Sequence, residues 1–170
     1  TQSAYSFAVV ATDAAGNVSQ AQSVTLDINN LDDTAATITS GDTAAAIDEN
    51  SGAGQVIYTA TADDSADVSD GVTFSLAAGS DAALSIDAAT GAVTLTTDPD
   101  FETQSAYSFA VVATDAAGNV SQAQSVTLDI NNVDDTAATI TSGDTADAID
   151  ENSGAGQVIY TATADDSADV

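Results

Sequence analysis

The chain repeats itself with a period of 102 residues. Residues n and n+102 are identical at 66 of the 68 positions that can be compared, and the exceptions are Leu31 against Val133 and Ala45 against Asp147. A repeat of this length has the size of a folded domain, whereas the units of solenoid proteins are about 20 to 50 residues long. The chain is therefore expected to be part of a tandem array of domains.

The seams of the array are predicted at two related acidic segments. Asp27–Asp33 reads DINNLDD and Asp129–Asp135 reads DINNVDD, and each follows a strand-like run. This divides the chain into residues 1–32, the end of one repeat, 33–134, a complete repeat, and 135–170, the start of the next. The two flanks together lack a copy of residues 69–102, so neither is expected to fold alone.

The charge of the chain excludes several classes of partner. It has 27 Asp and Glu residues and no Lys, Arg or His, which gives a net charge of −27. Such a surface repels nucleic acids and anionic membranes, and only cations from solution can balance it. We therefore expect no nucleic acid, membrane insertion or small-molecule substrate. Adaptation to a saline habitat is a second interpretation of the acidic surface. With no Cys in the sequence, no disulfide can stabilise the fold.

Alternation of apolar and polar residues dominates the repeat. Tyr107, Phe109 and Val111 share one face of an extended segment, and similar short runs occur around Ile38 and at 56–61, 72–76, 84–86, 93–96 and 126–130. Turn-forming segments such as SGAG, DAATG and DAAGN separate these runs. The pattern predicts an all-β fold of tandem, seven-stranded, antiparallel Greek-key β-sandwiches of the immunoglobulin-like type. The aromatic residues expected in its core are Tyr58, Phe74, Phe101, Tyr107 and Phe109.

Glutamate is confined to two positions of the repeat. Glu49 and Glu151 lie in IDEN, and Glu102 lies in DPDFE, among 24 aspartates. Calcium prefers about six to eight oxygen ligands, of which a glutamate can supply two. Asp100 and Glu102 are two residues apart, so they project from one face of an extended chain, and the same holds for Asp129 and Asn131.

Motif after motif, the unit resembles the cadherin repeat. The matching strings are IDENSGAGQVIYTATADD, FSLAAGSDAALSIDAATGAVTLTTDPDFE, YSFAVVATDAAGN and VTLDINNVDD. Glu49 stands at the glutamate of the family's Pro-Glu-Asn motif, and Asp100 and Glu102 at its Asp-Arg-Glu motif. Asp129 and Asn131 match the first half of the Asp-x-Asn-Asp-Asn linker. Val133 interrupts the second half, which leaves Asn132, Asp134 and Asp135 as alternatives there.

The resemblance implies calcium sites between consecutive domains. The junction near Asp134 would use Glu49, Asp100, Glu102, Asp129, Asn131 and Asp134 with Asp165 and Asp166. The junction near Asp32 would use Asp27, Asn29 and Asp32 with Asp63, Asp64 and Asp115. Stronger calcium occupancy is expected at the later junction. A polar loop is the alternative for Asp63, Asp64 and Asp67, and a turn for Asp115.

Near-identical repeats without positive charge also resemble the extender regions of giant bacterial RTX-type adhesins, including those that bind ice. The function implied is that of a calcium-rigidified spacer on the bacterial cell surface. Its partners would be neighbouring repeats of the same chain, joined through calcium-bound linkers. In the alternative interpretation, each repeat binds a glycan or a partner chain. An enzyme is disfavoured, because the chain has no His, Cys, Lys or Arg for acid-base or oxyanion chemistry.

Overall fold

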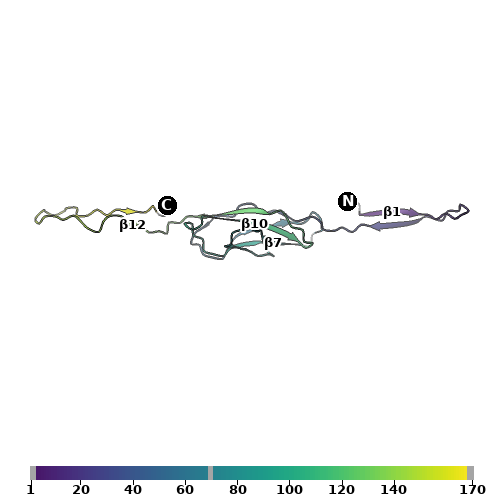
Figure 1. Ribbon diagram of the computed structural model, residues 1–170, viewed down its shortest axis with the longest axis horizontal. Helices are drawn as coiled ribbons and strands as arrows, with labels where there is room; N and C mark the ends of the chain where they lie inside the picture. The colour runs from purple at the N-terminus through teal and green to yellow at the C-terminus, as the bar shows by residue number, and fades with distance from the viewer. Residues whose placement is uncertain (1–2, 69–70, 168–170) are drawn as a thin grey trace.

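The computed structural model describes residues 3–68 and 71–167. The middle of the chain forms a β-sandwich, and the two ends extend from opposite ends of this sandwich as thin ribbons (Figure 1). All elements of the described residues are β-strands. Within them, no helix exists that is long and apolar enough to cross a membrane.

The first sheet of the sandwich has four strands in the order β4-β11-β10-β7. These strands span Ile47–Asp48, Gln124–Asn131, Ala106–Asp115 and Val72–Leu76. β10 pairs antiparallel with β11 and β7, whereas β4 pairs parallel with β11. β10 and β11 bury alternate residues, because successive side chains of a strand point to opposite faces.

The second sheet has the antiparallel order β5-β9-β8, with strands at Gln55–Thr59, Ala92–Leu95 and Leu84–Ile86. A short antiparallel pair, β3 at Thr37–Ile38 and β6 at Ala62–Asp63, continues this sheet, since β6 follows β5 after two residues. The chain crosses between the sheets after β3, β4, β6, β7 and β9. This connectivity is that of a Greek-key sandwich, and the predicted all-β fold class is confirmed.

The core lies between the two sheets of the middle part. Every buried hydrophobic residue among those described falls between Ala36 and Ile130. Of the aromatic residues predicted to be in the core, Phe101 is half-buried and the other four are buried. The rings of Tyr58 and Phe109 meet edge to face, with centroids 5.6 Å apart. The Tyr58 hydroxyl donates a 2.6 Å hydrogen bond to the carbonyl of Gly41, so the one polar atom of this ring is satisfied.

The ribbons at the two ends repeat parts of the sandwich without closing into one. β1 at Ala4–Val9 and β2 at Gln22–Asp27 form a hairpin with the register of β10 and β11. β12 at Thr139–Ile140 and β13 at Ala164–Asp165 pair as β3 and β6 do. Their large apolar side chains are exposed, except for the half-buried Val24. The described residues thus contain one closed sandwich, and the tandem arrangement with boundaries after residues 32 and 134 stays a prediction.

Two strand details differ from the sequence expectation. After the expected strand around Ile38, the structure has a second strand, β4, that the sequence did not predict. It was missed because Ile47 has no alternating apolar neighbours. β10 also extends to Asp115, so the DAAGN turn begins on the last strand residue instead of after it. Both differences depend on pairing with β11 and β7, which no local pattern specifies.

Replacing Gly91 by Ala is expected to destabilise the sandwich strongly. Gly91 has φ +71°, and a Cβ there would lie 2.4 Å from the carbonyl oxygen of Ala60, in a neighbouring backbone. The left-handed conformation alone costs a residue with a Cβ about 1–2 kcal/mol, and the clash adds to it. Chemical denaturation should therefore give a loss well above this figure.

Gly79→Ala is the matched control, because Gly79 has φ +91° and open space around its hypothetical Cβ. The Gly79→Ala variant should lose only the stability that the left-handed conformation costs a residue with a Cβ. Equal losses for the two variants would show that the sandwich relieves the clash at Gly91 by a backbone shift.

Candidate metal centres

The exit pole is the end of the sandwich where residues 131–135 leave it, and it carries a compact carboxylate group. Glu49 follows β4, while Asp100 and Glu102 lie in the segment between β9 and β10. One oxygen from each of these three residues lies within 4.8 Å of the others. Among residues 3–68 and 71–167, this is the one group of three or more acidic side chains so close together. The structure thus brings together the three residues that the two glutamate motifs predicted.

Glu49 is held by backbone amides on both sides. Its side chain is buried, with 3% of its surface exposed. The amide of Phe101 donates to Oε2 at 2.8 Å, and the amide of Val133 donates to Oε1 at 2.7 Å. A carboxylate has about four lone-pair sites, so both oxygens keep capacity for a cation. Glu49 therefore ties the DPDFE segment to the departing linker.

Two more side-chain contacts hold the linker at the exit pole. Asn131 Nδ2 donates to Asp48 Oδ1 at 2.9 Å, and Asn50 Nδ2 donates to Asp135 Oδ2 at 2.5 Å. Asn50 reaches the linker from a left-handed backbone conformation, with φ 55°. The predicted ligands Asp129 and Asp134 are exposed and lie outside the group of Glu49, Asp100 and Glu102.

The entry pole is the opposite end of the sandwich, where the linker from β2 arrives, and it carries unpartnered carboxylate oxygens. Among the described residues, the buried side-chain atoms that lack a hydrogen-bond partner are Asp32 Oδ1 and Asp64 Oδ2. Burial, together with the carboxylates of Asp115, Asp64 and Asp67, raises the pKa of Asp32. A buried oxygen without a partner is costly, so these two atoms indicate a place for a cation.

Asp115 is the most buried carboxylate of the entry pole. It ends β10 with 5% of its surface exposed. Its oxygens accept hydrogen bonds from the backbone and side chain of Asn119, at 2.8 and 2.9 Å. Burial alone would raise the pKa of Asp115, but the hydrogen bonds from Asn119 and neighbouring amides outweigh it and keep this pKa below the ordinary value. Asp115 is therefore an ionised side chain facing the linker.

The remaining predicted ligands are not assembled with these groups. Asp63 is exposed, and hydrogen bonding first with the side chain and then with the amide of Ser65 lowers the pKa of Asp63. Asp165 forms the same turn with Ser167 in the C-terminal ribbon. The other predicted ligands that lie exposed on the ribbons are Asp27, Asn29 and Asp166. Of the adjacent pair Asp63 and Asp64, the structure therefore turns only Asp64 toward Asp32.

Two residues that the sequence did not assign contact the linkers, and so does Asp67, for which the sequence left a ligand and a polar loop as alternatives. Asn50 and Asn119 donate to linker oxygens at 2.5 and 3.3 Å, and Asp67 accepts from Asn30 and from the amide of Asp33. Their signal was present in the sequence, because Asp67 lies in DDSADVSDG, Asn119 lies in DAAGN and Asn50 follows Glu49, so each is close to a predicted ligand. Both segments are also ordinary turn formers, so the linker contacts appear only in the tertiary structure.

The chemistry of both poles fits calcium. All the side-chain donors are carboxylate and amide oxygens, which are the ligands that hard cations such as Ca²⁺ take. The entry pole has two buried carboxylate oxygens without a hydrogen-bond partner, and the exit pole has three carboxylates close together. The chain has no cationic side chain that could neutralise either group. Glu49, Asp100 and Glu102 would hold the ion at one pole, and Asp32, Asp64 and Asp115 at the other.

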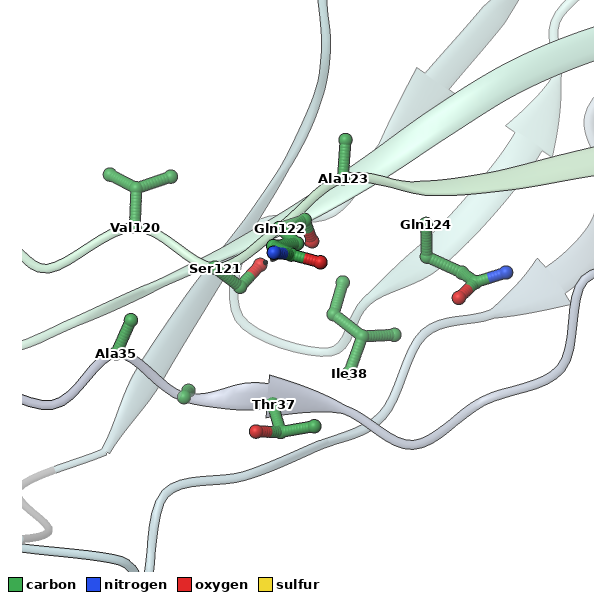
Figure 2. A pocket seen from close by; sticks show the side chains of 9 residues that line it. Ala35, Thr37, Ile38, Val120, Ser121, Gln122, Ala123 and Gln124 are labelled. Carbon is green, nitrogen blue, oxygen red and sulfur yellow. Dashed lines mark hydrogen bonds between the residues drawn. The ribbon is translucent and has the colours of Figure 1, made fainter.

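A cavity of about 400 Å³ lies between β3 and the segment that precedes β11. Figure 2 shows Ile38 lying between these two segments, with Val120 and Gln124 on the opposite side. The cavity is lined by Ala35, Ala36, Thr37, Ile38, Val120, Ser121, Gln122, Ala123 and Gln124. Its lining contains no acidic and no aromatic side chain, so it offers neither a metal site nor a platform for stacking a sugar ring.

The fold is shared with several animal proteins. The chain is similar to mouse cadherin-23 EC22-24, with a TM-score of 0.63 and 20% identity over 82% of this chain and 45% of that chain. It is also similar to the protocadherin gammaB7 EC3-6 cis-dimer structure, with a TM-score of 0.58 and 22% identity over 81% of this chain and 35% of that chain. For the human desmocollin-1 ectodomain the TM-score is 0.56 and the identity 21%, over 81% of this chain and 28% of that chain.

These similarities concern the fold, and the chain spans less than half the length of each of these three structures. No curated protein sequence matches the chain. The family model of the cadherin domain matches residues 43–131, which is more than half of the chain and includes both sheets apart from β3. The chain therefore belongs to the cadherin family.

Proposed function

We propose that this chain is a calcium-rigidified extender of a large bacterial cell-surface adhesin, which projects a terminal binding domain away from the cell. The observation that carries the proposal is the convergence of Glu49, Asp100 and Glu102 at the pole where the linker leaves. Because the sequence repeats every 102 residues, the same group would recur at each junction of an array.

At the level of the family, several properties follow directly. Cadherin domains are extracellular, adhesive or structural modules that bind calcium at the linkers between them, and they are not enzymes. The acidic group at the exit pole lies beside such a linker, since Glu49 accepts a hydrogen bond from the amide of Val133. A calcium-dependent extracellular repeat is therefore the general class of this chain.

Stiffness would come from neutralising the junctions. Carboxylates repel one another across each linker, and the chain has no Lys, Arg or His to offset this. Bound calcium supplies the missing positive charge at the junction. Glu49, Asp100 and Glu102 would hold it from the preceding domain. Asp134 of the linker, with Asp165 and Asp166 of the following domain, would complete the site.

The bacterial adhesin assignment is supported by the sequence. Near-identical units, the absence of cationic side chains and a composition rich in Asp, Thr and Ala are typical of extender regions. Identical units suit a spacer, because its function depends on the number of units and not on differences between them. A repeat that itself binds a glycan or partner chain is the alternative, and glycan-array binding by isolated repeats would favour it.

Small-angle X-ray scattering on three tandem copies of residues 33–134 tests the proposal. With calcium we expect a rod with a maximum dimension of about 120 Å, because each unit adds about 40 Å from strands of about ten residues and a linker. Excess chelator should shorten the average end-to-end distance and broaden its distribution, since the uncompensated linkers then bend.

Copies carrying Glu49→Gln and Glu102→Gln are the control for this measurement. They should give the flexible profile even with calcium. A maximum dimension that chelator leaves unchanged in the parent array would contradict the spacer proposal.

A further inference from the structure

The N-terminal hairpin exposes an apolar face that the sandwich buries. Residues 4–28 are identical in sequence to residues 106–130, and their strands pair in the same register. Phe109 is 3% exposed in the sandwich, whereas its copy Phe7 is 55% exposed in the hairpin. Within the described residues, β2 has a strand on one side only, so its second edge is a template for another strand.

The C-terminal ribbon carries the segment that occupies this edge in the sandwich. Residues 42–49 run parallel beside β11, and the amide of Ala44 donates to the carbonyl oxygen of Thr127 at 2.8 Å. Residues 144–151 repeat this segment, except that Asp147 replaces an exposed alanine. They form no strand in the ribbon, which contains no copy of β11.

The same ribbon carries an aromatic ring that fits the apolar face of the hairpin. In the sandwich, the ring of Tyr58 packs edge to face against Phe109. Tyr160, the copy of Tyr58, is exposed, yet its hydroxyl donates to a glycine carbonyl as the hydroxyl of Tyr58 does. The ribbon therefore holds this ring in place by itself, and Phe7 has the sequence position of the ring's partner.

A second copy of the chain is the occupant that fits both surfaces. The hairpin and the C-terminal ribbon leave opposite ends of the sandwich (Figure 1). Within one chain they would meet only if both linkers folded back along the sandwich, whereas two chains placed end to end meet without such bends. Each surface then contacts a sequence that the sandwich already pairs with its copy.

We propose that the C-terminal ribbon of one chain docks on the N-terminal hairpin of a second copy, with residues 144–151 added in parallel beside β2. The two surfaces differ, so every complex keeps a free hairpin at one end and a free ribbon at the other, and chains join into open filaments. The flanks contain no copy of residues 69–102, so the joint lacks strands equivalent to β7, β8 and β9. The contact is therefore weak, and dilute chains stay separate.

Repulsion between the acidic chains opposes this contact. Each chain has a net charge of −27 and no cationic side chain. At an ionic strength of about 1 M the screening length falls to about 3 Å, so apolar and backbone contacts decide whether chains join. Sodium chloride supplies this ionic strength, and chelator removes calcium, so the test does not depend on the proposed function.

Sedimentation equilibrium of the full chain under these conditions, between about 10 µM and about 1 mM, tests the proposal. We expect a weight-average mass near 16.7 kDa at the lowest concentration and more than twice this value at the highest. A mass that stays at one chain shows that nothing docks, and a mass that levels off at two chains shows a closed contact. Either result would overturn the proposal.

Matched variants identify the two surfaces. Phe7→Ser and Ile159→Ser each change a side chain that is exposed in its ribbon but whose copy in the sandwich is buried, and each should weaken association at least about tenfold. Val158→Ser is the control, because its copy Val56 is 60% exposed in the sandwich. It should associate like the parent. Equal losses for Val158→Ser and Ile159→Ser would mean unspecific apolar aggregation and would contradict the proposal.

A mixture of the two weakened variants tests the pairing of hairpin with ribbon. Phe7→Ser keeps an intact ribbon, and Ile159→Ser keeps an intact hairpin, so an equimolar mixture should form dimers and stop there. Longer complexes in the mixture, or no complex at all, would show that the two surfaces are not each other's partners.

Introduced cysteines test the register. Thr43 and Thr127 face each other in a parallel bridge of the sandwich, and the chain has no Cys of its own. A chain with Thr25→Cys and Thr145→Cys should therefore form disulfides between chains on oxidation. A chain with Thr25→Cys and Ala146→Cys should not, because a shift by one residue turns the side chain to the other face. Equal cross-linking of the two would rule out the register of the sandwich and overturn the proposal.

Discussion

Saturating calcium is expected to raise the melting temperature of this protein by about 10 to 20 °C for each tightly held ion. A ligand that binds only the folded state at one hundred times its Kd stabilises that state by about 2.7 kcal/mol, and each kcal/mol moves the melting temperature of a domain of this size by about 4–8 °C. Circular dichroism would follow unfolding with calcium and then with excess chelator. Magnesium should do much less, because it demands stricter geometry and gives up its waters reluctantly.

The repeat supplies a matched pair of variants for this experiment. Glu49→Gln removes a carboxylate that is buried beside Asp100 and Glu102. Glu151→Gln changes the identical residue in the C-terminal ribbon, where the side chain is exposed. We expect Glu49→Gln to abolish most of the calcium-dependent rise and Glu151→Gln to leave it intact. Coincident melting curves of the parent with calcium and with chelator would mean that the acids are a salt-adapted surface.

Truncating Leu128 to Ala is expected to destabilise the sandwich by about 2–5 kcal/mol, the range for leucine in a well-packed core. Leu128 is fully buried between the sheets. The core around it is thin, since the chain has no Trp or Met and only 5% aromatic residues, so few large side chains can fill the cavity. Denaturant titrations of the parent and the variant measure the loss.

Leu26→Ala is the control for this prediction, because Leu26 occupies the equivalent position of the N-terminal hairpin with 54% of its surface exposed. Its stability should change by no more than about 0.5 kcal/mol. A loss at Leu26 as large as that at Leu128 would show that the hairpin packs against another surface in solution.

The alternation in the sequence predicted the strands because it is encoded locally, whereas the acidic group at the exit pole was predicted in other ways. Tyr107, Phe109 and Val111 point inward as their spacing indicates. Glu49 and Glu102 were identified by the rarity of glutamate, and they meet at the exit pole. The family resemblance supplied their grouping with Asp100, which spacing alone could not, since 51 positions separate Glu49 from Asp100.

The contributions of Asp63, Asp64 and Asp67 could not be ranked from the sequence. All three lie in one polar loop, and each could have been a ligand or a turn former. Asp63 pairs with the nearby amide of Ser65, whereas Asp64 and Asp67 face the arriving linker. The direction of a side chain in a loop depends on what packs against the loop, and here that is the linker.

The duplicated sequence separates local from tertiary causes directly. The hairpin β1–β2 has the register of β10–β11, the pair β12–β13 has that of β3–β6, and Asp13 and Asn17 repeat the hydrogen bonds of Asp115 and Asn119. In each case both partners lie within the same short stretch of chain, so the sequence by itself determines the structure.

Unlike these local features, burial and the acidic groups at the poles differ between identical copies of the sequence. Residues 55–59 form β5, but their copy at 157–161 forms no strand, because β5 needs β9 as a partner and the C-terminal ribbon has none. Leu128 and Glu49 are buried while their identical copies Leu26 and Glu151 are exposed. Apolar surface leaves water, and carboxylates converge, only when a second sheet and a linker cover them. The tertiary structure alone therefore decides where this protein has a core and where its carboxylates gather.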